Sequence, residues 1–103
     1  MNVSSLTGRE LSLIAGVFRR HPEIAAVKLF GSRAKATHTP SSDIDLAVWG
    51  DVDALRAEAI AAELDELPLP YRFDVKPFEL IALRALREHI ERVGVPIYPL
   101  NGH

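Results

Sequence analysis

Two short motifs in the first half of the chain carry residue types suited to phosphate and metal chemistry. Gly31 and Ser32 directly follow an apolar run, and Asp43 and Asp45 stand at alternate positions of a second apolar run. Backbone N–H groups at a glycine-serine turn can approach and bind a phosphate, especially where a helix begins. Paired carboxylates can hold a hard divalent cation. The two motifs together indicate a nucleotide or phosphate site with a metal.

A third carboxylate stands in a later apolar stretch, at Asp74. On a strand, Asp43 and Asp45 would share one face about 6.5–7 Å apart, and their like charges call for a cation between them. Magnesium suits such a site because it keeps waters and takes further oxygens from a phosphate. With Asp74 from a neighbouring strand, the set could hold two ions that clamp the attacking and leaving oxygens. Asp74 is also placed to accept a proton from an attacking hydroxyl.

Basic and hydroxyl side chains beside the glycine would complete the phosphate half of the site. The Ser32 hydroxyl can donate to a phosphate oxygen, Arg33 can bind one bidentately, and Lys35 can act as a point charge. Other Asp-x-Asp chemistries fit less well. Aspartyl-phosphate phosphatases want a Thr or Val where this chain has Ala47, and an EF-hand needs oxygen ligands and a glycine that are missing here.

The elements that must position these residues follow in the order helix, strand, loop, strand, helix, strand, helix. Thr7 and Glu10 form a capping-box pattern before the first helix, and Asp51 or Asp53 can cap the second. Apolar residues at helical spacing predict a last helix over 80–93, ended by Gly94. Strands are expected at 24–30, 43–48 and 71–75, with an edge strand at 95–98. This pattern predicts one α/β (α+β) domain over 1–103, a small mixed β-sheet with helices packed on it.

Composition limits the classes of function. The chain has 103 residues, a formal net charge of −2, a pI near 6.0 and no cysteine. The net charge indicates no positively charged surface of the kind that binds nucleic acid. The absence of cysteine excludes disulfides and thiolate metal sites. The N-terminal residues show no signal-peptide pattern, and no apolar run approaches a membrane span, so a cytoplasmic protein is expected. His21, His89 and His103 are expected at the surface, and Tyr71 and Trp49 are expected to pack.

The motif residues resemble the signature of the DNA polymerase β-like nucleotidyltransferase superfamily. The resemblance rests on GSRAK at 31–35, on SDIDL at 42–46, and on the segments at 69–75 and 90–94. The short chain looks like a minimal nucleotidyltransferase of prokaryotes. The resemblance implies the polymerase β-like fold, a nucleoside triphosphate donor, usually ATP, and Mg²⁺. The donor's NMP would pass to an acceptor hydroxyl, with release of pyrophosphate.

The resemblance also assigns roles to individual residues. Asp43, Asp45 and Asp74 would be the catalytic and metal-binding carboxylates, with Asp74 also the base. The nucleotide-binding residues would be Gly31, Ser32, Arg33, Lys35 and Ser42.

Partners follow from the resemblance and from the size of the chain. Minimal members are often encoded beside a small helical protein of the HEPN or substrate-binding type. In some pairs the nucleotidyltransferase is an antitoxin that adds AMP to a tyrosine of a HEPN toxin. The chain ends before an acceptor-binding domain could fit, so a partner or a second copy must supply that site. Two alternatives stay open: a non-catalytic module that masks a helical partner, and a nucleotide-sensing domain.

Overall fold

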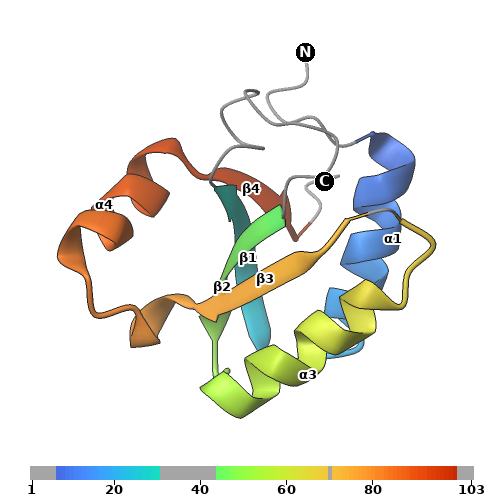
Figure 1. Cartoon of the computed structure of the whole chain (residues 1–103), viewed down its shortest axis with the longest axis horizontal. Helices are drawn as coiled ribbons and strands as arrows, with labels where there is room; N and C mark the ends of the chain where they lie inside the picture. Colours follow the sequence, from blue (N-terminus) through green and yellow to red (C-terminus); the bar gives the residue numbers. More distant parts are fainter. Residues whose placement is uncertain (1–6, 31–43, 70, 100–103) are drawn as a thin grey trace.

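The computed structural model describes residues 7–30, 44–69 and 71–99, and it centres on a mixed four-stranded sheet (Figure 1). This agrees with the predicted fold class. The elements in chain order are α1 (Gly8–Arg19), β1 (Ile24–Phe30), β2 (Ile44–Gly50), α3 (Ala54–Asp65), β3 (Phe73–Pro77), the 3₁₀ helix η1 (Phe78–Leu80), α4 (Arg84–Val93) and β4 (Val95–Tyr98).

The strands lie in the order β3-β2-β1-β4. β1 is antiparallel to both β2 and β4, whereas β2 and β3 are parallel and are connected through α3. A parallel pair needs such a crossover, because the chain must return to the same end of the sheet. β4 is an edge strand, as its sequence predicts. Its Pro96 has no backbone N–H, which an edge strand tolerates because one of its sides has no neighbouring strand.

Helices cover the two faces of the sheet unequally (Figure 1). α1 and α3 lie together on one face, called the α1/α3 face below. α4 lies on the other, called the α4 face. Along β2, Ile44, Leu46 and Val48 point into the apolar core of the α1/α3 face. The intervening residues therefore point to the α4 face, because side chains alternate along a strand.

The helix starts follow the local signals in the sequence. The Glu10 N–H donates to Thr7 Oγ1 at 3.1 Å, and the Thr7 N–H donates to Glu10 Oε1 at 3.0 Å, so the predicted capping box is present. Of the two candidate caps for α3, Asp53 is the one that serves, since its Oδ1 accepts from the Arg56 N–H at 2.8 Å.

The third strand begins and ends later than its sequence predicts, at Phe73–Pro77 instead of 71–75. Its first residue is fixed by contacts from two other elements. The Phe73 N–H donates to Asp65 Oδ1 at 3.3 Å, and the carbonyl of Arg72 accepts from the Ile44 N–H at 2.8 Å. Pairing with β2 therefore starts at Phe73, where the buried ring enters the core.

The prediction of one continuous last helix from residue 80 is wrong. The chain forms η1, leaves helical geometry, and starts α4 only at Arg84. Leu80 is 59% exposed and Leu83 is 65% exposed, so these two leucines do not belong to a buried stripe. Among the residues of α4, Ile90 alone is fully buried. In the described parts of the chain, no helix is long and apolar enough to span a membrane.

Candidate functional site

Two of the predicted site carboxylates lie side by side. Asp45 of β2 and Asp74 of β3 are direct partners in the parallel register. Side chains at paired positions of neighbouring strands point to the same face, and the strands are about 4.8 Å apart. Since Leu46 and Phe73 point into the core of the α1/α3 face, both aspartates project onto the α4 face. The structure thus brings together carboxylates from two different strands.

The surroundings of the pair differ from one side to the other. On β1, the residue paired with Asp45 is Phe30, which is only 6% exposed. On β3, the Asp74 side chain is 48% exposed, and its Oδ2 accepts from Lys76 Nζ at 2.6 Å. The site therefore has an apolar wall on the β1 side and an accessible, charged side on β3.

All five of the predicted nucleotide-binding residues lie outside the described part of the chain. They are Gly31, Ser32, Arg33, Lys35 and Ser42, and the same is true of Asp43. Their chain neighbours are described, however. Phe30 directly precedes Gly31 and is paired with Asp45, and Ile44 directly follows Asp43 and is paired with Phe73. The segment that carries these motifs thus leaves and re-enters the sheet beside the two carboxylates.

The donor set fits a hard divalent cation. Carboxylate oxygens are the ligands that Mg²⁺ takes from proteins, and it completes its shell with water and phosphate. Asp74 already holds a cation, the Lys76 ammonium, which shows that its carboxylate is open to positive charge. Within residues 7–30, 44–69 and 71–99 no cluster of three potential ligands occurs. A three-carboxylate site therefore requires Asp43.

Lys76 is the residue near the site that the sequence reasoning missed. It stands two positions after Asp74 on the same strand, and residues at that spacing share a face. The alternation that placed Asp43 beside Asp45 could have found it. Arg72 is exposed and precedes β3, and no ion pair or hydrogen bond of its side chain is seen in the described structure.

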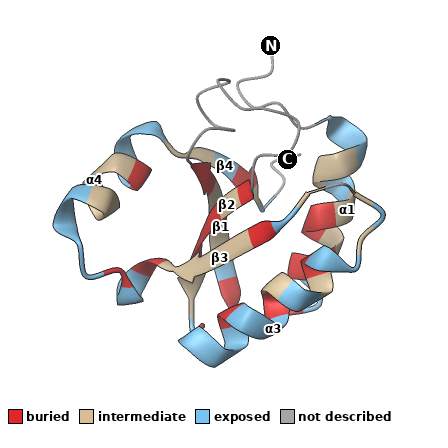
Figure 2. Ribbon diagram, in the orientation of Figure 1, coloured by how far each residue is buried: buried red, intermediate tan, exposed pale blue. Residues whose placement is uncertain are grey.

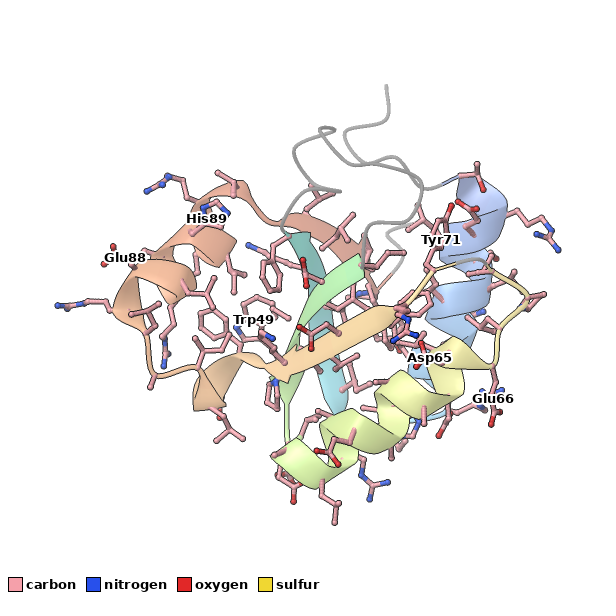
Figure 3. All side chains as sticks on the ribbon, in the orientation of Figure 1. Trp49, Asp65, Glu66, Tyr71, Glu88 and His89 are labelled. Atoms are coloured by element: carbon pink, nitrogen blue, oxygen red, sulfur yellow. The ribbon has the colours of Figure 1, made fainter. Side chains whose placement is uncertain are left out.

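Two other sequence predictions have clear outcomes. The prediction that His21 lies at the surface is wrong, since the residue is only 8% exposed. Its Nδ1 lies 3.3 Å from Glu23 Oε2, and its Nε2 lies 3.0 Å from Glu63 Oε2. Trp49 does pack: its ring stacks on Phe78 with centroids 4.4 Å apart, on the α4 side of the sheet (Figure 3). Neither residue contributes a ligand to the carboxylate pair.

Comparison with known protein families gives one match that spans most of the chain. The family model described as Polymerase beta, Nucleotidyltransferase matches residues 13–102. Among curated protein sequences, no significant match was found.

Solved toxin–antitoxin complexes contain chains of similar fold. One, described as a toxin-antitoxin with AMP-PNP, is 23% identical with a TM-score of 0.74, covering 85% of this chain and 72% of that one. A MntA-HepT toxin-antitoxin is 20% identical with a TM-score of 0.69, covering 89% and 72%. A third match is in a complex of a tri-AMPylated Shewanella oneidensis HEPN toxin with an MNT antitoxin. The sequence identity is 22% and the TM-score 0.68, covering 87% of this chain and 70% of that one. At these identities the likeness establishes the fold.

Proposed function

Since this chain belongs to the polymerase β nucleotidyltransferase family, we propose that it transfers the NMP of a nucleoside triphosphate to an acceptor hydroxyl. The observation that carries the proposal is the pairing of Asp45 with Asp74 in register on one face of the sheet. The expected donor is ATP, because one neighbour of similar fold is described with AMP-PNP and another with an AMPylated toxin.

The reaction forms one bond and breaks another at the α-phosphorus. The acceptor oxygen attacks this phosphorus, its proton passes to the Asp74 carboxylate, and the bond to the β-phosphate oxygen breaks to release pyrophosphate. Asp43, Asp45 and Asp74 would hold Mg²⁺, two ions in the fullest arrangement. When bound, these ions neutralise charge that develops on the phosphate oxygens. The chain's own task is to fix carboxylates from separate strands at one place.

The triphosphate would lie against the segment that follows β1. Gly31 and Ser32 offer backbone N–H groups, and Arg33, Lys35 and Ser42 add cationic and hydroxyl donors. Phe30 and Asp45 are paired in register, so a donor held at Gly31 would have its phosphates close to the carboxylates. The apolar wall at Phe30 lowers the local polarity and so strengthens electrostatic interactions at that side.

The acceptor is proposed to be a tyrosine hydroxyl of a helical HEPN-type partner, which would make this chain an antitoxin. The support is the description of similar folds in complex with HEPN toxins, one of them tri-AMPylated. In this proposal the partner brings both the acceptor hydroxyl and the surface that positions it at the carboxylates.

The test uses α-labelled ATP, Mg²⁺ and a HEPN-type protein encoded beside this chain. We expect wild type to label the partner, and Asp45→Asn and Asp74→Asn each to lower the rate by about 100-fold or more. Asp51→Asn is the matched control, because it removes an exposed aspartate just beyond the opposite end of β2 and should keep near-full activity.

The same experiment separates catalysis from masking. If the partner is neutralised equally well by wild type and by Asp45→Asn, without label, the chain acts as a non-catalytic binding module. If label appears with all variants alike, the carboxylate pair is not the catalytic site.

A further inference from the structure

The Lys76 ammonium contacts Asp74, one of the carboxylates of the candidate metal site. Lys76 Nζ lies 2.6 Å from Asp74 Oδ2, a short charge-assisted contact. Lys76 is itself paired in register with Ala47, one position along from the Asp45–Asp74 pair. Lys76 and Asp74 stand two residues apart on β3, so both side chains project onto the α4 face and the ammonium can meet the carboxylate.

We propose that Lys76 is a positioning residue that serves as the internal counter-ion of the site. It holds the Asp74 carboxylate in place when no divalent cation is bound, and it must give way when one binds. Lys76 thereby lowers the affinity of the site for the cation. This inference rests on the proposed function, since it gives the metal-binding carboxylates of that function a built-in competitor.

The competition follows from charge and distance. An ammonium and a divalent cation on one carboxylate would lie within several ångströms of each other, where like charges repel appreciably even near a surface. Lysine is suited to yielding, because its flexible stem lets the charge move aside without loss of the backbone pairing. The side chains of Lys76 and Asp74 are 39% and 48% exposed, so the ion pair is weak enough to be displaced.

The chain supplies a matched control in Lys28. This residue is paired with Ala47 from the other side, so Lys28 and Lys76 flank the same alanine on the same face of the sheet. The Lys28 ammonium has different partners: it lies 5.7 Å from the Trp49 ring centroid and donates to the Glu91 carbonyl at 3.5 Å. Removing either lysine changes the net charge equally, but only Lys76 touches Asp74.

The test is direct binding of Mn²⁺, measured without nucleotide by the electron paramagnetic resonance signal of the free ion. We expect Lys76→Met to bind Mn²⁺ about three- to ten-fold more tightly than wild type, as loss of a weak ion pair and of a repulsive charge predicts. Lys76→Arg keeps the charge and should stay within about two-fold of wild type. Lys28→Met should also stay within about two-fold, since its ammonium has other partners.

A double substitution asks whether Lys76 acts through Asp74. In an Asp74→Asn background, Lys76→Met should change Mn²⁺ affinity by less than about two-fold, because the contact that it relieves is already gone. Equal changes in the two backgrounds would show a general charge effect and would overturn the inference.

The remaining outcomes distinguish this inference from the proposed function. Equal affinities of wild type and Lys76→Met, with Mn²⁺ bound by both, would overturn the role of Lys76 and leave nucleotidyl transfer standing. An equal gain from Lys28→Met would also overturn it. Absence of Mn²⁺ binding by wild type at millimolar ion would overturn the counter-ion role, whereas the metal-dependent reaction is tested by the labelling experiment with ATP and Mg²⁺.

Discussion

The two faces of the sheet are built from alternate residues of the same strands, yet they are buried to different degrees (Figure 2). The α1/α3 face carries a continuous apolar core to which every strand and both covering helices contribute. The α4 face carries a smaller cluster made of Phe30, Ala47, Phe78, Ile81 and Ile90. Beside that cluster lie Asp45, Asp74 and Lys76, all of which are partly exposed.

Because of this difference, residues that stabilise the fold and residues of the candidate site are neighbours in the chain. In β2, Ile44 and Leu46 are fully buried on one face, while Asp45 between them projects onto the other. Burial of Ile44 and Leu46 holds β2 in place, and the position of β2 in turn sets the position of the Asp45 carboxylate. A site that needs like charges close together is destabilising in itself, so a rigid, well-packed opposite face is the natural support for it.

The largest effect is expected from emptying the core of the α1/α3 face. Ile60 of α3 is 0% exposed within that core, so Ile60→Ala should lower the free energy of unfolding by about 3–5 kcal/mol. Urea denaturation measures the loss. Leu55→Ala, on the same helix but 76% exposed, is the control and should stay within about 0.5 kcal/mol. A loss below about 1 kcal/mol at Ile60 would contradict the comparison.

A smaller effect is expected from the same truncation on the α4 face. Ile90 is also 0% exposed, but it packs in the smaller cluster, whose neighbours can relax into the space left behind. Ile90→Ala should therefore cost about 2–3 kcal/mol by urea denaturation. Leu83→Ala, just before the same helix and 65% exposed, should be nearly neutral. Equal costs at Ile90 and Ile60 would mean that the two faces are packed alike.

The smallest effect is expected at the rim of the α1/α3 face, where Glu63 joins α3 to the end of α1. A hydrogen bond from His21 Nε2 at 3.0 Å, together with nearby charge, lowers the pKa of Glu63 below its usual 4.5. A depressed pKa gives stability that is present above about pH 4.5 and is lost as pH falls through the folded-state value. The Glu63 side chain is 35% exposed, so screening keeps this contribution below about 1 kcal/mol.

Glu63→Gln tests this pH dependence. The variant should be slightly less stable than wild type at pH 7, and the difference should shrink as the pH falls through the lowered folded-state pKa of Glu63 and its carboxylate becomes protonated. Urea denaturation at a series of pH values measures it. A difference that is independent of pH would show that packing, and not the charge of Glu63, links the two helices.

Local signals predicted the elements well, because short-range physics decides them. The capping box joins Thr7 and Glu10, only three positions apart in the chain. The same reasoning failed for residues 80–83, where leucines at helical spacing predicted a buried stripe. Spacing states which side chains could share a helix face, but not whether another element is present to bury them. At Leu80 and Leu83 the described structure packs none close enough to do so.

The sequence by itself determined that Asp45 would point away from the core, because alternation along a strand is a property of the local backbone. It also supplied the third carboxylate. Only the tertiary structure decided that Asp74 would stand directly beside Asp45 and that Lys76 would contact it. The register of β3 on β2 depends on how α3 packs and on where Phe73 enters the core, and such long-range contacts leave no periodic trace in the sequence.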